Sequence, residues 1–225
     1  MPVKDGFGGR LDLSVSGDTG NTSTSSITTG VGAQWKHGRT TNLFVINYAY
    51  GQSNKVTDTN KGFAHYRHIY QKNKARAYEA FAQLETDEFA RLRSRTLLGG
   101  NIRYTMYEEK ETHVSTGTGA FYEREVLDEQ PDVTDAGTSY LWRANLYFVV
   151  GYKLNENITA NSTSYFQPAI ENLDDVRLLE NASLRIKLAD DLDLKISLNI
   201  SYESRPPQTV TGTDTTYNTG VEYRF

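Results

Sequence analysis

The chain alternates apolar and polar residues with a period of two along most of its length. Residues 220–225, Gly-Val-Glu-Tyr-Arg-Phe, show this clearly, because every second side chain is apolar or aromatic. This is the period of a β-strand whose two faces meet different surroundings. It predicts strands at residues 10–15, 27–35, 44–50, 78–85, 91–106, 114–123, 140–153, 182–188, 192–203 and 220–225.

Two further segments carry a weaker form of the pattern. In residues 62–70 either face fits as the apolar one, and in residues 157–167 Asn and Thr dilute the alternation, so both registers stay open. With these segments the chain has about twelve strands, an even number that suits a closed antiparallel up-and-down barrel. Residues 75–90 are rich in Ala and Glu, which favour helix, but the alternation from Tyr78 to Leu84 outweighs that propensity.

The final strand fits two folds, and the lengths of the links favour one of them. A last strand ending on Phe225 resembles the closing strand of bacterial outer-membrane β-barrels, whereas the edge strand of a soluble β-sandwich would alternate equally well. The long links are all odd-numbered and therefore share one end, as in outer-membrane barrels. The second, fourth, eighth and tenth links are tight, around 36–39, 71–73, 154–156 and 190–191, whereas the third, seventh and eleventh, around 52–61, 127–138 and 204–215, are longer.

Aromatic residues gather at two levels of the predicted barrel, with mostly aliphatic residues between them. Two aromatic girdles around an aliphatic band are typical of membrane barrels, because amphipathic rings prefer the interface between lipid and water. We therefore predict an all-β, closed antiparallel transmembrane barrel. The aromatic residues assigned to its interfaces are Trp35, Tyr48, Tyr78, Tyr104, Tyr122, Trp142, Tyr152, Tyr202, Tyr223 and Phe225.

Composition and charge exclude several other classes of protein. The chain has no run of about 18 apolar residues, which excludes a transmembrane helix. It has no Cys, and hence neither a disulfide framework nor a Cys-ligated metal site. Its formal net charge of -4 argues against binding to nucleic acid. Residues 1–5 lack a basic segment followed by an apolar core, so we expect an exported form that has already lost its signal peptide.

Three stretches carry a resemblance to a known family. They are Gly-Asn-Thr at 20–22, Glu-Ala-Phe-Ala-Gln at 79–83, and Pro206-Pro207 followed by Asp-Thr-Thr at 214–216. Together with Phe225 they make the chain similar, over almost its whole length, to the bacterial family of salt-induced outer membrane proteins, whose function is unknown. The resemblance implies a barrel in a Gram-negative outer membrane, assembled there by the barrel assembly machinery. It supplies no catalytic residues.

We expect one barrel domain over residues 1–225, in which residues 1–8 form a short periplasmic segment. An Arg or Lys facing lipid at mid-bilayer costs about 2–4 kcal/mol, so the charged faces of the strands should point into the lumen. Glu180 departs from this rule, because it shares a face with Ala182 and Leu184. The predicted lumen residues are Arg67, Glu79, Glu85, Arg91, Arg93, Arg95, Arg103, Glu123, Arg143, Arg177, Arg185, Glu203 and Glu222.

These lumen charges allow two functions. Basic side chains around water would make a narrow passive channel for small solutes, anionic ones in particular. Interlocked Arg–Glu pairs would instead plug the lumen of a structural or stress-related barrel. A barrel of about twelve strands lies between filled eight-stranded barrels and open porins, so size leaves both hypotheses open.

A third hypothesis is an outer-membrane lipid hydrolase. His113 and Ser115 share a strand face, a spacing similar to that in the outer-membrane phospholipase, but the wider motif is missing, so no catalytic residue is assigned. The four His residues have no metal-ligand spacing, and neither metal nor cofactor is expected. The expected partners are outer-membrane lipids, lipopolysaccharide and the barrel assembly machinery. The protein is expected to be monomeric.

Overall fold

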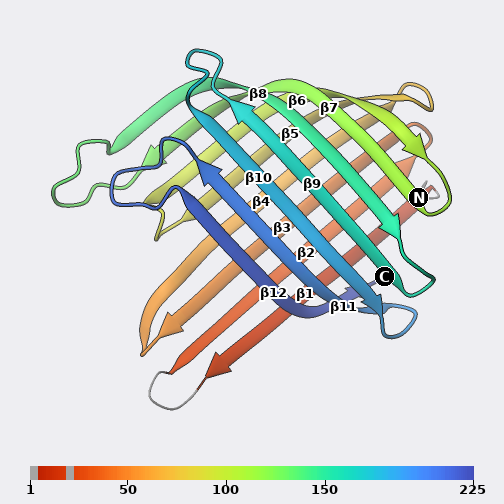
Figure 1. Cartoon of the computed structure of the whole chain (residues 1–225), viewed down its shortest axis with the longest axis horizontal. Helices are drawn as coiled ribbons and strands as arrows, with labels where there is room; N and C mark the ends of the chain where they lie inside the picture. Colours follow the sequence, from red (N-terminus) through yellow and green to blue (C-terminus); the bar gives the residue numbers. More distant parts are fainter. Residues whose placement is uncertain (1–4, 19–22) are drawn as a thin grey trace.

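The chain folds into a closed antiparallel barrel of twelve strands, which confirms the predicted fold class. A computed structural model describes residues 5–18 and 23–225. Each strand pairs with its neighbours in the sequence, and β1 pairs with β12 to close the barrel (Figure 1). The strands are β1 Gly6–Asp18, β2 Thr24–His37, β3 Thr40–Ser53, β4 Val56–Gln71, β5 Arg76–Asp87, β6 Leu92–Glu108, β7 Thr112–Leu127, β8 Gly137–Lys153, β9 Ile158–Pro168, β10 Val176–Lys187, β11 Leu192–Glu203 and β12 Thr213–Arg224.

The links sort by length onto the two ends of the barrel, largely as predicted. The end where β1 begins and β12 ends, here called the turn end, carries short links such as 38–39 and 72–75. The opposite end, here called the loop end, carries the long links 128–136 and 204–212. The predicted long link at 52–61 is wrong, because β3 and β4 continue through it to a two-residue turn. That turn has positive φ at both Asn54 and Lys55, which is the geometry of a tight hairpin.

The two weak segments take definite registers. In β4, Phe63, His65 and Arg67 face inward, whereas Tyr66 and Tyr70 are more than 40% exposed on the outside. In β9, Gln167 is buried inside and Phe166 is exposed outside. Residues 6–8, expected in an N-terminal segment, already belong to β1, and residues 1–4 lie outside the described part of the chain.

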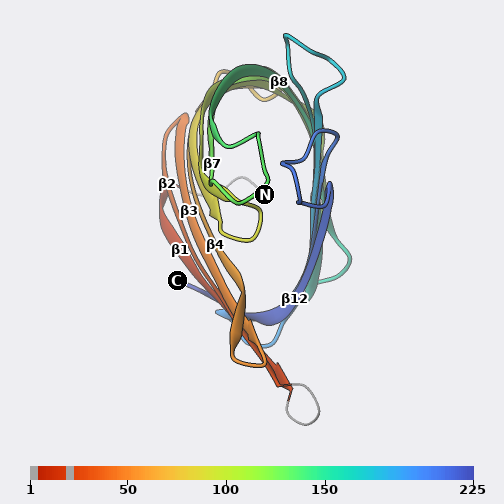
Figure 2. The same ribbon diagram turned by 90° about the vertical axis from the view of Figure 1, so that its left-hand side faces the viewer.

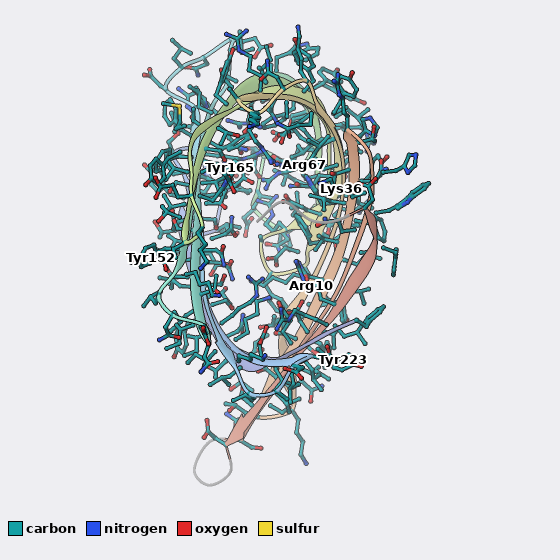
Figure 3. The ribbon with its side chains drawn as sticks, turned by 90° about the vertical axis from the view of Figure 1, so that its right-hand side faces the viewer. Arg10, Lys36, Arg67, Tyr152, Tyr165 and Tyr223 are labelled. Carbon is teal, nitrogen blue, oxygen red and sulfur yellow. The ribbon has the colours of Figure 1, made fainter. Side chains whose placement is uncertain are left out.

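The predicted interface aromatics lie mainly on the outer surface, with Trp35 and Phe225 about 60% exposed and Tyr104 the most covered of the set. Figure 3 shows Tyr152 and Tyr223 outside the ring of strands, and Arg10, Arg67 and Tyr165 inside it.

The described part of the chain contains no helix long and apolar enough to cross a bilayer.

The seam between β1 and β12 is the shortest ladder of the barrel. It pairs Arg10 with Arg224 through to Leu13 with Val221, and two backbone hydrogen bonds between Gly9 and Phe225 extend it toward the turn end. The two strands approach so closely here that a Cβ atom at Gly220 would overlap the carbonyl oxygen of Leu13. Closure of the barrel therefore depends on a glycine at position 220.

We predict that Gly220→Ala weakens the closure of the barrel by about 1–3 kcal/mol, because the added methyl group has no room beside Leu13. Urea unfolding of the barrel in lipid vesicles measures the change. Gly8→Ala is the matched control, since a Cβ there would meet Phe225 at an ordinary 3.9 Å. Equal stability of both variants would contradict this account of the seam.

Candidate functional site: the lumen

An ion-pair network spans the lumen near the loop end. Arg95 on β6 contacts Glu85 and Glu125 on the neighbouring strands, at 3.2 and 2.6 Å, and Glu203 on β11 at 2.9 Å. Arg177 on β10 contacts the same Glu203 at 2.9 Å and Glu125 at 2.8 Å. Because β6 and β11 are five strands apart, these pairs bridge opposite walls and occupy the lumen between them.

The network continues into a buried layer. Glu123, 1% exposed, binds Arg177 and Arg143, and Arg143 also binds Asp175 at 2.9 Å. Carboxylates buried this deeply need several donors to offset the loss of water, and here guanidinium groups supply them. Glu123, Arg143 and Arg177 of this layer are held on β7, β8 and β10, and Asp175 lies in the link just before β10.

A second buried carboxylate, Glu79 on β5, lies inside the lumen on the side of β4 to β8. It accepts a hydrogen bond from the Tyr147 hydroxyl at 2.8 Å and forms ion pairs with Arg103 and with Arg67, the latter at 3.5 Å. Tyr147 stands three strands away, so this contact also crosses the lumen. Asn101, which lies 3.5 Å from Glu79, connects the cluster to further amides on β8 and β9.

Apolar side chains close the rest of this half of the lumen. Phe81, Leu97 and Phe121 form a buried cluster on the inner faces of β5, β6 and β7. The rings of Phe81 and Phe121 meet edge to face with centroids 6.1 Å apart. Ion pairs and this cluster together leave little of the β4–β8 wall in contact with solvent.

The opposite half, formed by β10, β11, β12, β1 and β2, has a different cluster. Asp12 contacts Lys195 at 2.7 Å and Arg10 at 3.5 Å, and Glu222 contacts Arg185 at 2.8 Å and Lys195 at 3.5 Å. The carboxylates are covered, with side-chain exposures of 19% and 2%, whereas Arg10, Arg185 and Lys195 are 23–37% exposed. Three cations thus cover two carboxylates and present positive charge to the water in the lumen.

The long loops lie over the filled half of the lumen. Figure 2 views the loop end, where the green 128–136 loop and the dark blue 204–212 loop reach inward from the ring of strands. Arg91, 1% exposed, joins them by donating hydrogen bonds to Asp135 at 2.8 Å, to the Gln208 carbonyl at 2.8 Å and to the Asp128 carbonyl at 3.0 Å. The amide of Gln208 donates to Asp135 at 2.6 Å. We call this set of four residues the loop latch.

Two predicted lumen residues lie elsewhere. Arg91 belongs to the β5–β6 link, where it has a positive φ of 55° and holds the loop latch. Arg93 sits in an irregularity of the β6–β7 ladder, with its side chain 67% exposed and paired with Asp128 at the rim. The same irregularity places Leu92 inside, whereas a strict period of two would put it on the outer face with Leu98, which is exposed. A β-bulge inserts an extra residue and inverts the alternation, which period-two reasoning cannot detect.

Other members of the lumen clusters were absent from the predicted set. Asp12, Lys195 and Arg10 alternate with apolar residues, so the signal existed, but the sequence does not show that these charges on β1 and β11 meet in the lumen. Tyr147 and Asn101 gave no signal, because an uncharged inward residue acquires its role only from the carboxylate that it meets across the barrel.

His113 and Ser115 do meet, in an order similar to a catalytic triad. His113 Nε2 lies 3.2 Å from Ser115 Oγ, and Glu108 binds the other ring nitrogen. Ser115 is, however, fully buried, with an exposure of 0%, so a lipid ester has no path to its hydroxyl. The arrangement supports a structural role for these residues.

Glu180 faces outward, as its position in the sequence indicated. Its carboxylate accepts hydrogen bonds from Ser162, at 2.6 Å, and from Ser164 on the neighbouring strand. On β11 it pairs with Ile200, and the next residue on the same outer face of that strand is Tyr202. Two hydroxyl donors therefore replace part of the hydration of this carboxylate.

The chain belongs to the family described as proteins of unknown function, DUF481, whose model matches residues 11–225. This confirms the predicted membership in a family without known function, while the salt-induced designation stays a prediction. No curated protein matches the chain in sequence.

Solved structures share the fold at low sequence identity. The NanC porin has a TM-score of 0.59 at 10% identity, over 96% of this chain and 98% of that one. The translocator domain of the autotransporter NalP from Neisseria meningitidis has a TM-score of 0.51 at 10% identity, over 97% and 87%. The KdgM porin in complex with disordered oligogalacturonate has a TM-score of 0.48 at 12% identity, over 97% and 99%. The first two of these likenesses show that the chain shares its fold with an outer-membrane porin and an autotransporter barrel.

We predict that Arg95→Ala destabilises the barrel by about 3–5 kcal/mol, because it removes the ion pair of Glu85 and leaves Arg177 as the remaining ion-pair partner of Glu125 and Glu203. Urea unfolding in vesicles measures the loss. Arg93→Ala removes an exposed guanidinium from the same strand and should change stability by no more than about 0.5 kcal/mol. Similar losses in the two variants would refute the bridging role of Arg95.

We also predict that acid opens the loop latch. The Gln208 backbone amide, followed by Arg91, holds the pKa of Asp135 below its ordinary value of 3.8. A lowered pKa in the folded state means that the latch is fully stabilising above pH 3.8 and is lost as pH falls through the lower folded pKa. Hydrogen-exchange protection of residues 128–136 should drop over that range, whereas Asp135→Asn should show low protection at every pH. Protection that stays constant down to the lowest pH at which the barrel remains folded would contradict this.

Proposed function

We propose that this protein is a barrel of the bacterial outer membrane that lets small solutes diffuse passively through one half of its lumen, with a weak preference for anions. The membrane location is supported by the exposed aliphatic and aromatic outer wall, which includes Leu11, Leu13, Val31 and Ile46. A protein surface of this kind is stable only in contact with lipid or with another apolar surface. The fold shared with the NanC porin supports the same location.

The observation that carries the proposed selectivity is the layer of three cations over two carboxylates. Arg10, Arg185 and Lys195 stand between the lumen water and the covered Asp12 and Glu222. Charged side chains that line a pore set its ion preference. Nearly all other charges of the lumen are compensated by ion pairs. The excess of positive charge is therefore small, and the preference for anions should be weak. Gly32 on β2 makes room for this layer, because the Arg10 side chain lies flat against it.

The alternative is a structural or stress-related barrel whose lumen is plugged. It is favoured by the cross-lumen contacts of Arg95 and Glu79 and by the buried cluster around Phe81. The salt-induced designation suggests a link to salt stress, which would be compatible with either function. A lipid hydrolase is disfavoured by the burial of Ser115.

The partners that we propose follow from the membrane location. They are outer-membrane lipids and lipopolysaccharide around the barrel, and the barrel assembly machinery during insertion. We propose a monomer, with no nucleic-acid ligand.

Single-channel recording in planar bilayers tests the function. We expect small, discrete openings and a reversal potential in a KCl gradient that indicates a weak preference for chloride. Lys195→Gln should shift this preference toward potassium, because it removes one of the three exposed cations. Lys187→Gln, in an exposed turn pair with Asp190, is the control and should leave it unchanged.

Absence of openings from correctly folded protein would favour the plugged alternative. Potassium selectivity of the unsubstituted barrel would refute the role proposed for the cation layer.

A further inference from the structure

The ladder that closes the barrel ends halfway along it. Among the described residues, β1 and β12 pair only as far as Leu13 and Val221, although β1 continues to Asp18 and β12 begins at Thr213. Beyond that point Ser14 reaches β12 through its side chain, whose hydroxyl donates to the Thr219 carbonyl at 2.7 Å. Each strand stays paired on its other side, β1 with β2 and β12 with β11. The seam is thus open in the loop-end half.

The outer side chains beside the opening show the lack of a neighbouring strand. Tyr217 on β12 is 82% exposed and Val15 on β1 is 67% exposed, whereas Tyr223 and Leu13 in the closed part are 47% and 46% exposed. Figure 1 shows the same divergence, with red β1 and dark blue β12 meeting at one edge of the barrel and separating toward their loop ends. Open strand edges are costly in hydrocarbon, because backbone groups there have no water to bind.

The inner side of the opening is polar and, apart from the carboxylate of Asp18 at the end of β1, which accepts a hydrogen bond from Thr24, it carries mainly uncharged groups. Inward positions there carry hydroxyl and amide groups, including Ser16, Thr216 and Asn218, and Ser16 bonds to Ser26 on β2 at 2.7 Å. The ion pair nearest to them joins Lys61 and Asp214 at 3.4 Å, so its charges compensate each other. Such a lining suits an uncharged group rich in hydroxyls rather than a phosphate.

The outer side of the opening leads to an apolar groove. The groove has a volume of about 440 Å³ and runs over the outer faces of β8 to β12, where Ala160 and Ala182 form its floor and Tyr152 lies at its β8 side. Tyr217 lines both the groove and the open seam. An acyl chain is an occupant of the right shape and polarity for this groove.

From these two sides together we infer that the open seam is a lateral portal for an amphiphile with an uncharged, hydroxyl-rich headgroup. The headgroup lies among the hydroxyls and amides inside, the acyl chain passes beside Tyr217 into the outer groove, and the amphiphile covers the strand edges that the ladder leaves open. The inference rests on the proposed membrane location and adds an exchange route between the lumen and the outer leaflet.

Quenching by brominated lipid tests the portal. Tryptophan reporters are placed in a Trp35→Phe and Trp142→Phe background, which removes both native tryptophans. Each variant is folded into phosphatidylcholine vesicles that also contain monoacylglycerol, an uncharged lipid with two headgroup hydroxyls, whose acyl chain either carries or lacks bromine. The reporters are Asn218→Trp at the inner side of the seam, Tyr217→Trp on the outer wall, and Thr163→Trp on the inner face of β9, away from the seam.

We expect strong quenching for Tyr217→Trp, little for Thr163→Trp, and quenching of Asn218→Trp several-fold above that of Thr163→Trp. Equal quenching of the two inner reporters would overturn the portal while leaving the membrane location intact. An unquenched Tyr217→Trp would overturn the membrane location and the portal with it.

Cysteine pairs give a second test, since the chain has no cysteine of its own. Ser16→Cys with Ser26→Cys should oxidise to a disulfide, because these residues are paired across β1 and β2. Ser16→Cys with Asn218→Cys should not, because the open seam separates them. Equally ready oxidation of both pairs would show a closed seam. Cross-linked dimers of Ser16→Cys alone would show that a second copy pairs with the open edge. Either result would overturn the portal.

Discussion

Everything in this barrel depends on the pairing of each strand with two neighbours. In a medium without water a backbone amide or carbonyl has only another backbone group to bind, so a sheet must close on itself. Closure then separates two environments, and the alternation along each strand distributes the side chains between them. Where pairing stops, at Leu13 and Val221, the separation of inside from outside also weakens. Strand pairing therefore determines both the wall of the barrel and the opening between β1 and β12.

Inside the wall, the distribution of carboxylates decides what the lumen can do. Glu79 and Glu123 are covered and surrounded by guanidinium groups from several strands, which ties the β4–β8 wall to β10 and fills that half. Asp12 and Glu222 sit behind exposed cations on the opposite wall. The same residue types thus have two roles. On one side, guanidinium groups surround the carboxylates and connect the strands, and on the other side exposed cations cover the carboxylates and form a charged surface.

Much of the fold could be predicted from the sequence, because alternation is a local property that barrel closure preserves. The final strand is an example: Val221, Tyr223 and Phe225 are exposed outside, and Glu222 is buried inside. The lumen was harder to predict. Arg95 and Glu203 are 108 positions apart and meet only because the four strands between β6 and β11 curve around the lumen. The bulge near Leu92 changed the role of Arg91 and Arg93, and a two-residue turn at Asn54 replaced an expected loop, since Gly-free sequences can also adopt positive φ.

The loop latch has a consequence for the size of this protein's bore. Arg91 gathers two long loops over the half of the ring that is already filled, so the accessible mouth is displaced to the side of β1, β2 and β12. In the channel that we propose, the circumference of the barrel, which twelve strands fix, sets the size of the opening in the lipid, whereas the uncovered part of the lumen sets the size of the opening that a solute meets. Two barrels of equal strand number can in this way differ in how much of the lumen stays uncovered, because loop contacts such as those of Arg91 decide which part of it the loops cover.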